Sequence, residues 1–138
     1  MTHFLHTQAN LDAALAQLIL ADPRLKPVAD KAGAFNLRRR EAGFAGLCAI
    51  VCGQQLSTAA AATIRNRLFA AFEPFHHDTV RAARTDKLKR LGLSAAKIKS
   101  IKEIGKAVAK GKIDLDRVGN MDADIAHTTL TALHGVGP

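Results

Sequence analysis

The sequence of 138 residues predicts an all-α fold, a compact array of about eight short helices. Apolar residues recur at helical spacing, as at Ile64, Leu68 and Phe72. Residues that cap helices well, such as Ser57 and Ser94, stand directly before such segments. No stretch alternates apolar and polar residues between hairpin turns, so no strands are expected.

Length and composition fit one domain over residues 1–138, and 48% apolar residues suffice for a sizeable core. No apolar run approaches the roughly 18 residues that a membrane-spanning helix needs. The N-terminal stretch MTHFLHTQAN lacks the basic start and apolar run of a secretory signal. We therefore expect a cytoplasmic protein without a membrane-spanning segment.

The most apolar part of the chain, residues 44–72, predicts two buried helices joined by a short polar loop. Residues 44–52 are apolar almost all round, which predicts the central helix of the core. The second helix follows Ser57 and ends at Phe72. Residues 54–56 carry two glutamines between these helices, so this loop is the first candidate for a functional site.

Six further helices are expected around this pair. One is capped by Asn10 and stops near Asp22, and a second short helix ends at Gly33. After a break at Pro74, helices are expected at residues 78–84, 85–92, 94–110 and 124–133, with Asp78 and Thr85 as caps of the first two. Residues 114–122 are expected to form turns.

The net charge of +8 comes from one segment, residues 81–112, which holds 11 Lys or Arg against two acidic residues. This suits contact with nucleic acid or an anionic membrane, although a solvated basic face explains the charge equally well. Within this segment, one side of a helix carries a lysine stripe, formed by Lys99, Lys102, Lys106 and Lys110. Residues 38–40 are three arginines in a connection, expected to be a solvated turn.

The cysteines and the paired histidines give no metal site. Cys48 and Cys52 lie one helical turn apart, too far for a disulfide, and we expect two small core residues. His76 and His77 lack a carboxylate or cysteine partner at ligand spacing and are expected to be surface residues.

The C-terminal residues 130–138 end in two glycines around an apolar residue. Gly135, Val136 and Gly137 suit a tight hairpin that aims backbone N–H groups at an anion, and Pro138 suits the start of a following helix. A plain helix C-cap explains Gly135 equally well.

Taken together, these pieces resemble the helix-hairpin-helix DNA glycosylase superfamily, most closely the family of DNA-3-methyladenine glycosylase II in its short form without an N-terminal β domain. The resemblance covers nearly the whole chain. It is carried by residues 44–72 with Gly53-Gln54-Gln55-Leu56-Ser57, by Leu91-Gly92-Leu93-Ser94 followed by Lys97, by residues 130–138, and by Asp22-Pro23-Arg24-Leu25.

The resemblance implies base-excision DNA repair, in which a damaged base is flipped out of double-stranded DNA and its N-glycosidic bond is hydrolysed. The bases implied are alkylated purines. The wedge that fills the gap would come from the loop of Gln54, Gln55 and Leu56, with Gln55 first and Leu56 second. Gly135, Val136 and Gly137 would hold backbone phosphate, in some members with a monovalent cation. No other cofactor and no membrane partner are implied, and a bacterial protein of this kind would associate with the nucleoid.

The family's catalytic aspartate would lie beyond Pro138, together with a second helix of the motif, so no catalytic residue is assigned. Asp122 and Asp124 match no catalytic position. We therefore expect the front part of a monofunctional glycosylase, truncated at its C-terminus and inactive alone. If the missing helix covers Leu130, Leu133 and Val136, their exposure would favour dimers or segment exchange.

Two alternatives to an alkylated-purine glycosylase stay open among the DNA-binding functions. The chain could be a non-enzymatic helix-hairpin-helix DNA-binding module, or a glycosylase for another lesion. A helical interaction domain with an incidental basic face is the remaining alternative.

Overall fold

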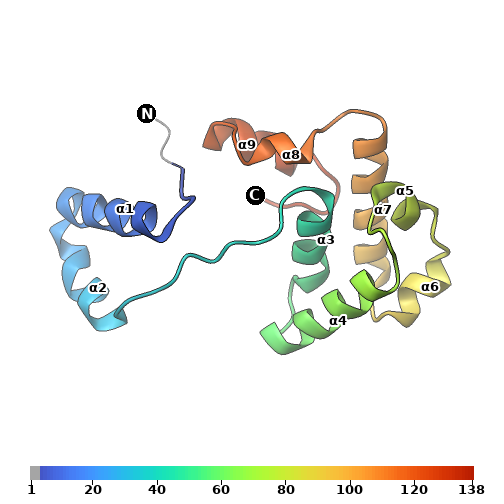
Figure 1. The fold of residues 1–138 in the computed structure, drawn as a ribbon, viewed down its shortest axis with the longest axis horizontal. Coiled ribbons are helices and arrows are strands. Elements are labelled where there is room, and N and C mark those ends of the chain that lie inside the picture. The colour runs from blue at the N-terminus through green and yellow to red at the C-terminus, as the bar shows by residue number, and fades with distance from the viewer. Residues whose placement is uncertain (1–3) are drawn as a thin grey trace. The chain divides into compact units, whose positions relative to one another are not determined.

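The computed structural model describes residues 4–138, and its described part is all-helical without a strand, as predicted (Figure 1). Over these residues the chain forms α1 (Gln8–Ala21), the 3₁₀ helix η1 (Pro23–Leu25), α2 (Lys26–Ala32), α3 (Gly43–Gly53), α4 (Thr58–Ala70), α5 (His77–Ala82), α6 (Thr85–Arg90), α7 (Ala95–Ala109), α8 (Leu115–Val118) and α9 (Ala123–Thr131). None of the helices between residues 4 and 138 combines the length and apolar character that crossing a membrane requires.

The described chain divides into two compact units, one up to Arg40 and one from Glu41 to Pro138. The first unit holds α1, η1 and α2 and buries no residue of these helices. Gln8 in α1 binds the segment that follows α2. Its Nε2 donates to Phe35 O at 3.1 Å, and its Oε1 accepts from Leu37 N–H at 2.8 Å.

The core of the second unit is built around α7, which packs against α3, α5 and α6. α7 is strongly amphipathic, and its apolar side buries Ile98, Ile101 and Ile104. α3 packs against α4, α7 and α8 and runs in the opposite direction to α7 (Figure 1). α3 buries Cys48, Val51 and Cys52, but Ile50 is 45% exposed. The expectation that this helix is buried all round is therefore wrong on one side, because its neighbours do not enclose it.

Three predicted helix starts are wrong by one or more residues, because a residue upstream already has the extended backbone of a cap. α1 begins after Thr7, whose hydroxyl accepts from Asn10 N–H. The Asn10 side chain accepts in turn from Thr7 N–H, which completes a capping box. α5 begins after His76, whose ring accepts from Asp78 N–H. Thr85 is the first residue of α6 and not its cap.

Other boundaries follow the prediction closely. Ser57 and Ser94 cap α4 and α7 through their hydroxyls, which accept from Ala60 N–H and Lys97 N–H.

The turn-rich passage of residues 114–122 contains the short α8, which the sequence did not predict. Asp114 caps it by accepting from Asp116 N–H.

Lysines from the basic segment hold the ends of neighbouring helices. Lys87 Nζ donates to Ala71 O, just past α4, at 3.0 Å, and lies over the Phe72 ring at 4.3 Å from its centroid. Lys102 Nζ donates to Ala83 O, just past α5, at 2.5 Å. A cation near a helix C-terminus stabilises carbonyls that lack an intrahelical partner. Part of the positive charge therefore serves the fold.

Candidate nucleic-acid interface

The predicted loop between α3 and α4 is a tight turn, here called the glutamine turn (residues 53–56). Leu56 N–H donates to Gly53 O at 3.3 Å. Gln54 has φ −56° and ψ 138°, and Gln55 has φ +59°. These angles and the hydrogen bond define a type II turn with Gln55 at its third position. The side chains of Gln54, Gln55 and Leu56 are all exposed.

Gln55 occupies a conformation that usually requires glycine. Among residues 4–138 it is the one non-glycine residue with positive φ. A left-handed conformation costs an L-residue about 1–2 kcal/mol, and the third position of a type II turn normally holds Gly or Asn. The turn keeps a long polar side chain at its apex despite this cost. Such strain is concentrated at functional sites.

Lys97, on the first turn of α7, holds the glutamine turn through two hydrogen bonds. Its Nζ donates to Cys52 O at 2.8 Å and to Gln54 O at 2.7 Å. One carbonyl belongs to the last turn of α3 and the other to the glutamine turn, so a single ammonium group links helix and turn. The sequence pointed to Lys97 only as part of a motif, because backbone acceptors leave no signal in the sequence.

The buried thiols next to this turn behave as core residues, as predicted. Cys48 and Cys52 are free, and both are almost completely buried. Burial raises the pKa of Cys52 to about 11, although the positive charge of Lys97 opposes this shift. Burial also raises the pKa of Cys48, with a smaller contribution from Cys52. Both side chains are therefore neutral at physiological pH.

The second predicted site, the glycine hairpin (residues 135–137), follows α9. Gly135 has φ +83°, and both Gly135 and Gly137 are exposed. Val136 is half-buried against the core, and its N–H donates to Leu133 O at 3.2 Å. Leu130 and Leu133 also pack against the core. These three apolar residues are thus partly buried, and less of their surface is open than the prediction assumed.

Gly135 lies so close to α7 that no larger residue fits without movement. A Cβ atom at Gly135 would overlap Ser100 Oγ and lie 2.6 Å from Ser100 Cβ. Ser100 is buried, and its hydroxyl donates to Ala96 O at 3.0 Å. Both the positive φ and the close approach require glycine here. A helix C-cap alone would not demand this close approach.

α7 thus brings the two predicted sites together, although they lie at opposite ends of the second unit's sequence. Lys97 holds the glutamine turn and Ser100 contacts the glycine hairpin. Side chains three residues apart lie on the same face of a helix, about 5–6 Å apart at Cβ. One face of α7 therefore supports both sites.

The lysine stripe predicted on α7 is only partly a free surface. Lys99, Lys106 and Lys110 are exposed. Lys102 is half-buried and holds the end of α5, so it does not belong to the exposed stripe. Residues 38–40 are exposed in the connection after α2, as expected for a solvated segment.

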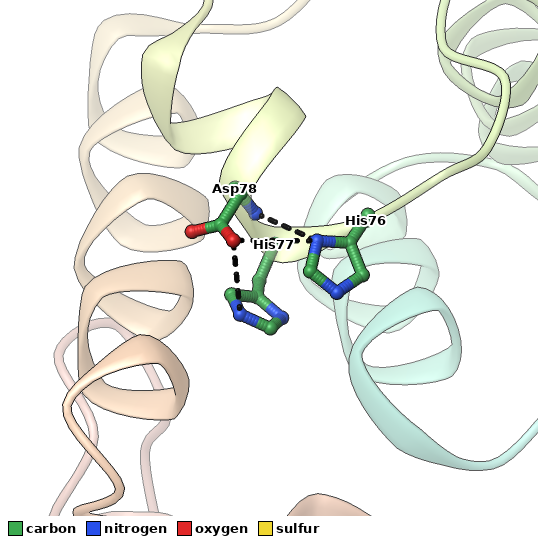
Figure 2. Close-up of side chains that lie close together, drawn as sticks. All are labelled: His76, His77 and Asp78. Atoms are coloured by element: carbon green, nitrogen blue, oxygen red, sulfur yellow. Dashed lines mark hydrogen bonds and ion pairs between the residues drawn. The ribbon is translucent and has the colours of Figure 1, made fainter.

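His76 and His77 do have a carboxylate neighbour, which corrects the expectation that they lack one. Figure 2 shows Asp78 beside both rings; its Oδ2 lies 3.7 Å from His76 Nδ1 and 3.7 Å from His77 Nε2. His76 Nδ1 already accepts from Asp78 N–H, and His77 packs edge-on against Phe44. Arg81 donates to the Asp78 carboxylate and thereby lowers its pKa. Through these interactions the three residues form the N-terminal end of α5.

Asp122 and Asp124 stand at the start of α9. The Asp122 carboxylate accepts from Asp124 N–H at 3.0 Å and so caps this helix.

Comparison with known proteins gives the glutamine turn and most of the second unit a family context. Residues 48–134 match the model of the HhH-GPD superfamily base excision DNA repair protein. The match includes the glutamine turn and Lys97 and ends just before Gly135. A comparison with curated proteins gave no match.

A solved structure shares the fold over most of this chain. It is a DNA-3-methyladenine glycosidase from Bacillus halodurans, with 26% sequence identity and a TM-score of 0.70. The similarity covers 86% of this chain but 56% of that one, so the present chain spans little more than half of its length. Together with the match over residues 48–134, this shows that the chain belongs to the HhH-GPD superfamily of base-excision DNA repair proteins.

Proposed function

We propose that this chain binds damaged double-stranded DNA and opens it at the lesion during base excision repair. The family match over residues 48–134 is the observation that carries this proposal. The exposed glutamine turn and glycine hairpin, both supported by α7, supply the surfaces that touch DNA. Reading a damaged base requires its removal from the stack, and a side chain must then fill the gap.

In this proposal the glutamine turn provides the wedge. Gln55 stands at the apex, and its left-handed backbone presents the side chain outward. Leu56 follows it and is 39% exposed. Gln55 is the first choice for the group that enters the duplex, Leu56 the second, and Gln54 borders them.

The glycine hairpin holds backbone phosphate in this proposal. Val136 N–H is already used by Leu133 O, so the amides of exposed Gly135 and Gly137 are the donors for an anion. Backbone amides bind phosphate without reading sequence, which suits a protein that must inspect any stretch of DNA. A monovalent cation could join this interaction in the complex.

For the whole protein we propose hydrolysis of the N-glycosidic bond of alkylated purines. The support is the Bacillus halodurans DNA-3-methyladenine glycosidase, to which the chain is similar. We further propose that residues 1–138 alone bind without excising, because the resemblance implies a catalytic aspartate beyond Pro138. Such a group contributes an electrostatic effect worth several powers of ten in rate.

Binding to short duplexes tests the first part. The 138-residue protein is titrated with a duplex that contains an abasic-site analogue and with an undamaged duplex of the same sequence, at two salt concentrations. We expect tighter binding to the abasic duplex and an affinity that falls with salt. Gln55→Ala keeps the strained backbone and removes most of the side chain, so it should reduce the preference for the abasic duplex. Asn66→Ala, at an exposed position of α4, is the matched control.

Equal affinity of the unaltered protein for both duplexes would contradict the wedge, and no salt-sensitive binding would contradict DNA binding altogether. The second part is tested by incubating the same protein with DNA methylated at purines and measuring released base. Released base above the level of a heat-denatured sample would overturn the proposal that these residues do not excise.

A further inference from the structure

We propose that Lys97 is a positioning residue for DNA opening: it holds the glutamine turn in the conformation that presents the wedge. This inference rests on the proposed function of the turn and adds the residue that sets its geometry. Lys97 does not need to touch DNA for this role, since it acts through the backbone of the turn.

The hydrogen bonds of Lys97 differ from those of the other lysines that hold helix ends. Lys87 and Lys102 each donate to one carbonyl directly after a helix. Lys97 donates to two, Cys52 O inside α3 and Gln54 O in the glutamine turn. The second acceptor belongs to the residue that precedes strained Gln55, so this bond fixes the peptide leading into the apex.

The backbone strain of the glutamine turn explains why it needs the hydrogen bonds from Lys97. Gln55 in a left-handed conformation disfavours the turn by an amount comparable to one or more hydrogen bonds. The hydrogen bond from Leu56 N–H to Gly53 O is long, at 3.3 Å, and all three tip residues are exposed. Hydrogen bonds from a charged donor are roughly twice as strong as neutral ones, so the ammonium of Lys97 can offset the strain.

The position of Lys97 on α7 also relates the turn to the other candidate site. Ser100, one turn further along α7, contacts the glycine hairpin. A wedge and a phosphate-binding hairpin must act on the same DNA at a fixed separation. Because both rest on one rigid helix face, Lys97 fixes the wedge relative to the hairpin as well as relative to α3.

Lys97→Met tests this role, with Lys102→Met as its matched control. Both changes remove one positive charge from α7 and one lysine that holds a helix end, but only Lys97 contacts the glutamine turn. We expect Lys97→Met to reduce the preference for abasic over undamaged duplex by about tenfold or more, the size of one hydrogen bond from a charged donor. Lys102→Met should leave the preference within about twofold of the unaltered protein.

A second readout follows the turn without DNA. Hydrogen exchange of Leu56 N–H reports how often the turn opens. Lys97→Met should speed this exchange by about tenfold, whereas Lys102→Met should not. Lys97→Arg, which keeps a cation with several donors, should restore part of both effects. It also serves as the test variant if the Met variant does not fold.

The outcomes separate the two proposals. If the unaltered protein shows no preference for the abasic duplex, the proposed wedge function fails, and the exchange measurement still decides whether Lys97 holds the turn. If the preference exists but Lys97→Met retains it, or if its Leu56 N–H exchanges no faster than in Lys102→Met, the positioning role of Lys97 is overturned.

Discussion

At the scale of single residues, Gln55 shows that the chain tolerates backbone strain at its candidate site. Its positive φ is unfavourable for any side chain with a Cβ, yet the residue is exposed and makes no packing contribution to the core. A residue selected only for stability at this position would be glycine. The proposed contact of this side chain with DNA would explain why glutamine stands here.

Gln55→Gly is expected to stabilise the protein while weakening its recognition of damaged DNA. Removing the left-handed strain should raise the free energy of unfolding by about 1 kcal/mol, after the entropy cost of glycine. Gln54→Gly, at φ −56°, should instead lower it by about 0.5–1 kcal/mol. Chemical denaturation of the two variants measures the difference, and a destabilised Gln55→Gly would contradict the strain argument.

Gly135 is the second residue whose identity the backbone dictates. Gly135→Ala should lower the free energy of unfolding by about 2–4 kcal/mol, because it combines a positive φ with overlap against Ser100. Gly137→Ala should change it by less than about 0.5 kcal/mol, since no atom lies within 4 Å of a Cβ at Gly137. Thermal unfolding of both variants checks this, and similar destabilisation of the two would refute the close-approach explanation.

At the scale of elements, α3 is held at its C-terminal end by buried thiols and by a lysine. Cys52 contributes to the core from one side of the last turn, while Lys97 binds the Cys52 carbonyl. The C-terminal end of α3 is thus held by the buried Cys52 side chain and by the hydrogen bond from the Lys97 ammonium group. This arrangement positions the glutamine turn that follows.

The raised pKa of Cys52 predicts a loss of stability at alkaline pH. The pKa is about 11 in the folded chain and about 8.5 in an unfolded one, so the folded state holds the thiol proton more tightly. Its contribution is complete below about pH 8.5 and is lost as the pH rises toward 11. The melting temperature should fall more steeply between about pH 8.5 and the folded-state pKa than in Cys52→Ala. Parallel curves for the two proteins would refute the burial effect.

At the scale of the whole molecule, the basic segment divides into lysines that hold the fold and lysines that face solvent. Lys87, Lys97 and Lys102 donate to backbone carbonyls at the ends of α4, α3 and α5. Lys99 and Lys106 on α7, and Lys110 directly after it, remain exposed. The excess charge of residues 81–112 therefore overstates the surface available to a polyanion.

Exchanging Lys99, Lys106 and Lys110 for glutamine tests whether this exposed charge binds DNA. For every phosphate that the variant no longer neutralises, the slope of log affinity against log salt should fall by about 0.9. The thermal stability should change little, because these side chains are exposed and the ion pair of Lys106 with Glu103 is long at 3.9 Å. An unchanged salt slope would place the stripe outside the DNA interface.

The sequence by itself determined the helical class, the capping roles of Ser57 and Ser94, and the buried cysteines, because all of these depend on local spacing and residue type. It also identified the family through short motifs that stay together along the chain. It missed the caps Thr7 and His76, because more than one nearby residue could begin each helix, and it missed α8, which is shorter than a sequence period can reveal.

Tertiary structure alone decided which residues support the candidate site. Lys97 binds carbonyl groups 43 and 45 residues away, and backbone acceptors have the same chemistry at every position of the sequence. The close approach of Gly135 to Ser100 arises only when α9 returns to α7. The glutamine turn and the glycine hairpin were visible in the sequence as two separate features. Packing on one face of α7 brings them together as parts of one candidate site.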